Sequence, residues 1–190
     1  SAVVVYGVLA GWWHRGLAGT GDTPSFMAAV RTMVSSEPHG DVAVALLTKG
    51  QVADEFYAGA VGAVNRETVF PVASMSKWVT AVGVMQLVRE GKIDLDAPVA
   101  RYLTRWTLPA GQFDNSGVTT RRLLSHTAGL TDGLGFGDYR LDERLPTLEE
   151  SLRAPRASSG QPTAIAVEYA PGARWQYSGG GYLILQLLVE

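Results

Sequence analysis

The period of the apolar residues changes at Ser74, and this change restricts the folds that the chain can adopt. Before it, two short apolar stretches, 41–48 and 51–61, flank a Lys-Gly pair, which predicts a β-hairpin. A third short extended piece is expected at 68–72, at an edge or end of the sheet because it contains proline. After Ser74 the apolar residues recur at helical spacing until Gly91, which predicts a helix that stops there. The expected class is therefore α+β, an antiparallel sheet with helices packed on it.

Five other segments complete this outline. Apolar residues at helical spacing predict a helix over about 24–36 and another from 182 to 189. Shorter helices are expected around 99–103 and from a capping threonine to position 126. Residues 138–165 are polar and weakly periodic, which favours a subdomain surface or a lid.

The N-terminus is an apolar run, 2–13, that ends at His14. It is shorter than the about 20 residues that a membrane-spanning helix needs. Two interpretations stay open: the trimmed end of a signal or anchor segment, or an apolar strand or helix packed on the domain. We therefore expect an N-terminal segment and linker over 1–23 and one domain over 24–190, with a possible membrane anchor upstream of residue 14. A periplasmic, secreted or membrane-anchored location is favoured.

Composition excludes several classes of function. The 190 residues carry a formal net charge of −2 and no concentrated basic run, which argues against a nucleic-acid partner. Cysteine is absent, so disulfides and thiolate chemistry are excluded, although no compartment is fixed by this. The histidines, His14, His39 and His126, lie far apart and lack metal-ligand spacing. We expect no metal and no cofactor.

The sequence Ser74-Met75-Ser76-Lys77 stands where an extended segment enters a helix. Positions three apart share a helix face, so the Ser74 hydroxyl and the Lys77 amine can meet. Serine needs a base within hydrogen-bond reach to act as a nucleophile, and a desolvated lysine can serve. The apolar flanks of Lys77 predict such burial. The competing interpretation is a capping serine followed by a lysine whose amine reaches solvent.

A second group of residues follows an aromatic-rich stretch, where Tyr177-Ser178 precedes three glycines that open a helix. Glycines there let the backbone approach another element or a ligand. Tyr177 can relay a proton between Ser74 and a leaving group if a nearby cation lowers its pKa. The alternative is a corner of aromatic packing with no chemistry.

Three segments together resemble a known family. The stretch 70–77, continuing through 84–96, resembles the nucleophile helix of class C β-lactamase-like proteins, serine hydrolases that include penicillin-binding proteins, D-aminopeptidases and esterases. The sequence LLSHTAGL at 123–130 is similar to that family's next landmark, and Tyr177-Ser178-Gly179 to its tyrosine motif. The resemblance covers about 40–190 and implies a β-lactamase/transpeptidase-like fold with a mostly helical subdomain.

The resemblance also implies roles. Ser74 is acylated, Lys77 activates it and Tyr177 relays protons, while Ser178 and Gly179 contribute to substrate binding. It implies no metal or cofactor.

The resemblance further implies that His126 is structural and holds a loop by hydrogen bonds. The family's tyrosine motif often ends in asparagine, where this chain has Gly179; this difference disfavours β-lactam hydrolysis. A third motif, Lys, His or Trp followed by x-Gly on an inner strand, is expected beyond Glu190. His14-Arg15-Gly16 fits that pattern, but at the wrong end of the chain. We therefore expect the C-terminal part of the fold to be missing and these 190 residues alone to be a poor catalyst.

Three hypotheses of function result. The first is a serine hydrolase or acyltransferase that acts on an amide or ester, such as a D-amino-acid peptide, a β-lactam or a carboxylic ester, through a Ser74 acyl-enzyme. The second is a non-catalytic scaffold of the same fold with a regulatory or ligand-binding role. The third, a membrane-tethered structural fragment, depends only on residues 2–13.

Overall fold

The computed structural model describes residues 18–19, 21–36, 40–60, 62–131, 139–140, 142–155 and 164–190. The chain divides into two compact units, Ser1–Pro71 and Val72–Glu190, and each is described by itself. The apolar run predicted as a membrane-related segment lies outside the described residues, so its interpretation and the predicted boundary after residue 23 stay predictions. Among the helices that are described, none is both long and apolar enough to cross a bilayer.

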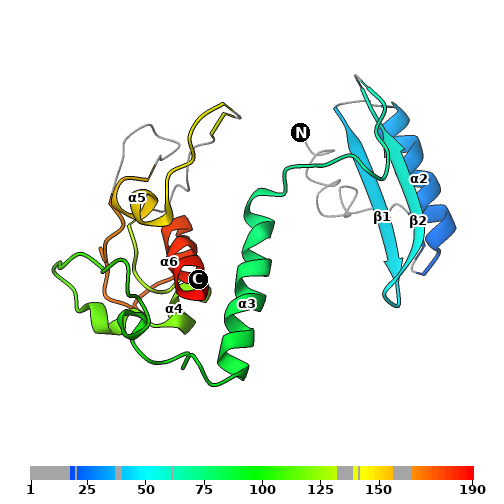
Figure 1. Cartoon of the computed structure of the whole chain (residues 1–190). Coiled ribbons are helices and arrows are strands. Elements are labelled where there is room, and N and C mark those ends of the chain that lie inside the picture. Colours follow the sequence, from blue (N-terminus) through cyan, green and yellow to red (C-terminus); the bar gives the residue numbers. More distant parts are fainter. Residues whose placement is uncertain are drawn as a thin grey trace, which may run out of the picture. The chain divides into compact units, whose positions relative to one another are not determined.

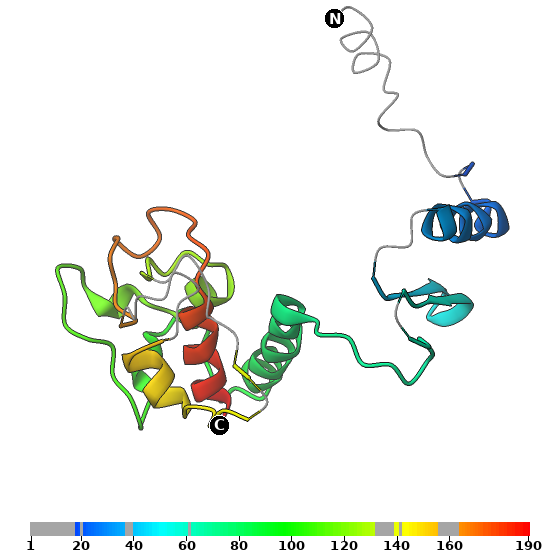
Figure 2. The same ribbon diagram turned by 90° about the horizontal axis from the view of Figure 1, so that it is seen from above.

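The first unit consists of one helix and one hairpin (Figures 1 and 2). Helix α2, Thr23–Ser36, lies against strands β1, Val42–Thr48, and β2, Gln51–Ala58, which pair antiparallel. The buried residues of α2 are Met27 and Val30. The helix and the hairpin are confirmed as predicted, with β2 ending earlier than expected.

The predicted third strand at 68–72 is wrong. These residues have no strand structure, and the sheet of the described chain consists of β1 and β2 alone. The Thr68 N–H instead donates to the carbonyl of Asn65 in a local turn. A strand exists only where a neighbouring strand supplies hydrogen-bond partners, and an apolar pattern cannot show whether that neighbour is present.

The second unit begins with the predicted nucleophile helix, as a short 3₁₀ turn, η2 (Ala73–Ser76), followed by α3 (Lys77–Arg89). The helix ends in a Schellman motif: the N–H of Lys92 donates to the Leu87 carbonyl at 3.0 Å, and that of Gly91 to the Val88 carbonyl at 3.0 Å. Gly91 has a φ of 69°, a left-handed conformation that glycine adopts without steric cost. The helix stop predicted at Gly91 is confirmed.

Helix α6, Gly179–Val189, is the central element of this unit (Figures 1 and 2). It packs against α3 and against two shorter helices, α4, Thr120–Leu124, and α5, Leu148–Arg153. Short 3₁₀ turns, η3 (Val99–Arg101) and η4 (Asn115–Gly117), lie in the connections. The helix expected at 99–103 is thus only a 3₁₀ turn, and α4 is capped by Thr119, whose side chain accepts from the Arg122 N–H.

The core of the second unit surrounds α6. Its largest fully buried side chains are Val84, Val99, Val118, Thr120, Leu123, Leu130, Leu152, Ile165, Ile184 and Leu185. These residues come from all the helices of the unit and from the loops between them. Burial of apolar area on this scale is the main favourable term in folding.

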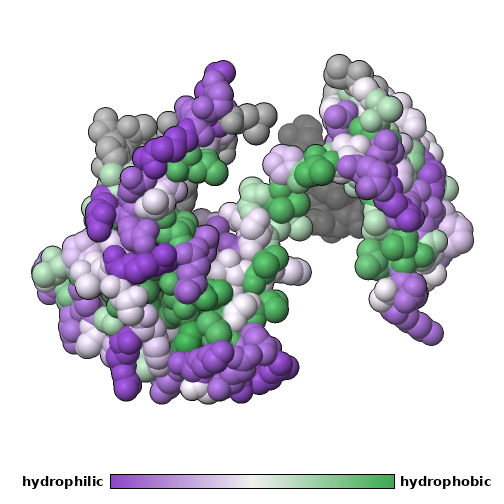
Figure 3. Space-filling model, viewed as in Figure 1, coloured by the Kyte–Doolittle hydropathy of each residue, from purple (hydrophilic) through white to green (hydrophobic). Residues whose placement is uncertain are grey.

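The second unit by itself does not bury the start of α3 as predicted. Met75, Trp78 and Val79 are 67%, 79% and 76% exposed. One side of α3 packs on α6 through the buried Val84, and Figure 3 shows apolar atoms gathered along the helix. Among the described helices of the second unit, none covers the side of α3 that bears Trp78 and Val79. The apolar pattern shows that a surface is fit to be buried, but the covering element must come from elsewhere in the chain.

The same substitution at two glycines of α3 should have opposite effects on stability. Gly91→Ala should lower the free energy of unfolding by about 1 kcal/mol, because alanine is strained at positive φ. Gly83→Ala should raise it by about 1 kcal/mol, because alanine favours a helix interior and its Cβ would meet Val189 at an ordinary 3.8 Å. Urea denaturation of both variants measures the two changes in the free energy of unfolding. Changes of the same sign would contradict the assigned end of the helix.

Candidate active site

Three polar side chains from separate parts of the second unit meet. The Ser74 Oγ and the Tyr177 Oη lie 2.6 Å apart, across a separation of 103 residues. The Lys77 Nζ lies 3.1 Å from the same Ser74 oxygen. Both distances are within hydrogen-bond range, so a hydroxyl, an amine and a phenol share one small volume.

The backbone conformation at the start of α3 determines where the Ser74 side chain lies. Ala73, the first residue of η2, has a φ of 43°, which turns the chain sharply, and the Met75 N–H closes the turn on the Val72 carbonyl at 3.0 Å. The 3₁₀ turn then leads directly into α3, so Lys77 follows Ser74 by one helical turn. A left-handed non-glycine residue is strained, and such strain is concentrated at functional sites.

Aromatic rings surround the amine of Lys77. Its Nζ lies 5.1 Å from the centre of the Tyr177 ring and 5.5 Å from that of the Tyr182 ring. Both distances are within the range of cation–π attraction, which holds the side chain toward Ser74. Tyr182 is a site residue that the sequence analysis missed; the aromatic residue directly after the glycine triplet was the available signal.

Tyr177 lies in the irregular segment that leads into α6. The two residues beside it are tied to one histidine: the Gln176 N–H donates to the His126 carbonyl at 2.8 Å, and the Ser178 N–H to the His126 Nδ1 at 3.1 Å. His126 therefore holds the segment around Tyr177 by hydrogen bonds, as the family resemblance implied.

The loop after α4 supports the rest of the same segment. The carbonyl of Thr127 accepts from the Gly172 N–H at 2.8 Å, and that of Gly129 accepts from Glu168 at 2.9 Å and Tyr169 at 3.2 Å. These bonds fix the path of the chain from 167 to 178, and with it the place of the phenol.

Ser178 and Gly179, predicted to bind substrate, lie at the start of α6. Ser178 is only 3% exposed, and its Oγ accepts from the Gly181 N–H at 2.9 Å as the helix cap. Gly179, the first residue of the helix, is also buried. Their substrate contacts stay a prediction, while their place next to Tyr177 is explained by the capping of α6.

Burial shifts the pKa values of two side chains of the site in opposite directions. Burial and the nearby Lys77 amine lower the pKa of His126, so its imidazole favours the neutral form. Burial raises the pKa of the Tyr182 phenol, with a further contribution from Tyr177. Ser74 itself is exposed to solvent.

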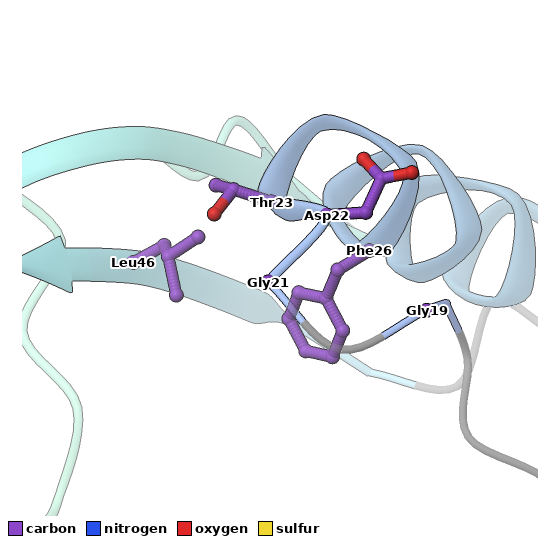
Figure 4. Close-up of a pocket in the computed structure, with 6 residues that line it drawn as sticks. All are labelled: Gly19, Gly21, Asp22, Thr23, Phe26 and Leu46. Atoms are coloured by element: carbon purple, nitrogen blue, oxygen red, sulfur yellow. The ribbon is translucent and has the colours of Figure 1, made fainter.

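No other place in the described residues offers comparable chemistry. A pocket of about 260 Å³ in the first unit is lined by Gly19, Gly21, Asp22, Thr23, Phe26 and Leu46 (Figure 4). It has a largely apolar lining and pairs no nucleophile with a base. Across the residues that the structure covers, no three His, Asp or Glu side chains are grouped to hold a metal ion.

Gly129 offers a test of the loop that positions Tyr177. A Cβ at this residue would overlap the carbonyl oxygen of Tyr169, and its φ of 78° is unfavourable for other residues. Gly129→Ala should therefore destabilise the fold by about 3 kcal/mol, from steric overlap plus backbone strain. The midpoint of thermal unfolding measures this. A loss no larger than that of Gly91→Ala, which has backbone strain alone, would contradict the assigned contact.

Comparison with known proteins places these features in a family. The family model described as Beta-lactamase matches residues 26–190. Esterase EstB of Burkholderia gladioli is 32% identical over 131 residues, 60% of this chain and 30% of the esterase. Penicillin-binding protein 4* of Bacillus subtilis is 29% identical over 123 residues, 65% of this chain and 25% of that protein.

A third relative, penicillin-binding protein 4 of Amycolatopsis lactamdurans, is 33% identical over 128 residues, 67% of this chain and 31% of its own length. The chain thus spans less than a third of each of these relatives. The family match extends over most of the chain and includes all the residues of the Ser74 site. The chain belongs to the β-lactamase family, which has serine β-lactamase-like and penicillin-binding proteins among its members.

Proposed function

We propose that the full-length protein is a serine hydrolase or acyltransferase that forms an acyl-enzyme on Ser74. The observation that carries the proposal is the approach of two proton-transfer groups to one hydroxyl: Tyr177 at 2.6 Å and Lys77 at 3.1 Å. A general base within this distance is what an unactivated serine needs in order to attack a carbonyl. The esterase and penicillin-binding relatives support the same class of chemistry.

Each proton that moves in the proposed reaction has a donor and an acceptor in the site or the substrate. The Ser74 oxygen bonds to the carbonyl carbon of an amide or ester while its proton passes to the neutral amine of Lys77. When the bond to the leaving group breaks, Tyr177 donates its proton to that group and is reprotonated from Lys77. Water, or another acceptor hydroxyl or amine, then displaces the acyl group from Ser74 by the reverse sequence.

This role for Lys77 requires a neutral amine, which desolvation favours. The apolar side chains next to it, Met75, Trp78 and Val79, are exposed in the described residues. We propose that a bound substrate covers part of this apolar surface and thereby removes water from the amine. An apolar acyl group suits such a surface better than a highly charged one.

The proposed substrates are amides or esters of the kinds expected from the sequence: D-amino-acid peptides, carboxylic esters or β-lactams. Gly179 stands where an asparagine amide would contact both lysine and substrate, which favours ester or peptide chemistry over β-lactam hydrolysis.

Active-site labelling tests the proposal. The full-length wild type should form a covalent adduct with a fluorophosphonate or a fluorescent penicillin, and Ser74→Ala should form none. Lys77→Met should slow labelling by about 10²- to 10⁴-fold, the usual contribution of a general base. Ser76→Ala is the matched control, because this neighbouring serine is exposed and its side chain makes no capping bond.

Absence of an adduct with both probes, in protein shown to be folded, would contradict the enzyme and favour the non-catalytic scaffold. Equal labelling of the wild type and Ser74→Ala would assign the nucleophile elsewhere.

A further inference from the structure

His126 occupies a position where glycine is usual. The helix α4 ends in a Schellman motif, with the Thr127 N–H donating to the Arg122 carbonyl at 2.8 Å and the His126 N–H to that of Leu123 at 3.2 Å. The left-handed residue of this motif is His126, with a φ of 57°. In the equivalent motif of α3 the chain uses Gly91. A side chain at such a position costs about 1–2 kcal/mol, so the imidazole must contribute something that glycine cannot.

The contacts of the imidazole show what it contributes. The backbone carbonyl and the Nδ1 of His126 bind the residues on either side of Tyr177, at 2.8 and 3.1 Å. Its ring also lies against the Tyr177 ring, with centres 4.6 Å apart. Tyr182 packs at 5.2 Å and Trp175 edge-on at 6.0 Å. One side chain thus touches the phenol ring and anchors the backbone that bears it.

We propose that His126 is a positioning residue that holds the Tyr177 phenol against Ser74 only while its imidazole is neutral, so that protonation of this histidine switches the site off. The inference rests on the function proposed above. The Nδ1 accepts a hydrogen bond, so the proton of the neutral ring is on Nε2. A second proton would turn Nδ1 into a donor that faces the Ser178 N–H, and this contact would be lost.

The surroundings of the ring favour the neutral state. The titratable groups that face it in the described residues are Lys77 from α3, Tyr177 from the preceding segment and Tyr182 from α6. Burial, followed by the charge of Lys77, lowers the pKa of His126 below its usual 6.5. The folded protein therefore binds fewer protons than the unfolded chain just below this pH, and stability falls as pH decreases from 6.5 toward the folded pKa.

Two substitutions separate the imidazole from the backbone turn. His126→Gly removes the side chain but suits the left-handed conformation, and it should slow fluorophosphonate labelling by about 10- to 100-fold through misplacement of the phenol. His126→Asn keeps a neutral acceptor and tolerates this conformation, and it should recover most of that loss. Ser125→Ala, at the exposed preceding residue, is the matched control and should follow the wild type.

The decisive quantity is the labelling rate of the wild type divided by that of His126→Asn. Both proteins keep Lys77 and Tyr177, so the ratio reports the effect of the histidine side chain. It should be constant above pH 7 and fall about tenfold for each unit below the pKa of His126. A ratio that stays constant through the midpoint of the His126 titration, as read from its nuclear magnetic resonance signals, would overturn the proposal. So would a His126→Gly variant that labels like the wild type.

Nuclear magnetic resonance of ¹⁵N-labelled protein tests the switch without activity. The Nδ1 of His126 should show the signal of an unprotonated nitrogen at neutral pH, and the ring signals of Tyr177 should shift with the midpoint of the histidine. A linked shift without any labelling would reject the proposed function alone. Labelling of Ser74 without a linked shift would reject the histidine switch alone.

Discussion

The site depends on the backbone hydrogen bonds of the loop that follows α4. Carbonyls from His126 to Gly129 accept from residues between Glu168 and Gln176, which fixes a long irregular segment that has no helix or strand of its own. Buried or half-buried backbone groups require such partners, so the path of this segment is specified in detail. Because the segment leads into α6, and α6 packs on α3, the same constraint brings Tyr177 to Ser74.

Strain accompanies this arrangement on both sides of the Ser74–Tyr177 contact. Ala73, just before Ser74, and His126, which packs on Tyr177, both have left-handed backbone, at φ 43° and 57°. The described residues include one other non-glycine residue of this kind, Lys49 in the hairpin turn. Each such conformation costs free energy that the surrounding packing must offset. Its occurrence at two residues that frame one polar cluster supports a functional rather than a purely structural origin.

The sequence predicts the features that depend on neighbouring residues. It does not predict those that depend on a contact with a distant part of the chain. The hairpin and the helix end at Gly91 follow from adjacent residues, and the approach of Lys77 to Ser74 follows from helical spacing. The strand at 68–72 and the burial of Trp78 required partners that no local pattern reveals. The contact of Tyr177 with Ser74 spans 103 residues; the residues alone left it open beside aromatic packing, and the family resemblance favoured the proton relay. Tyr182 was missed because its ring contacts depend on the fold of α6.

Peptide mapping of the full-length protein after brief exposure to a fluorophosphonate distinguishes an activated Ser74 from an ordinary surface serine. The chain contains several exposed serines, including Ser76 two residues from the proposed nucleophile. Convergence of an amine and a phenol on one hydroxyl predicts that the phosphonyl group is found on Ser74 alone. Modification spread over Ser74, Ser76 and other exposed serines at similar rates would show that the hydroxyl is not activated, and the account would be wrong.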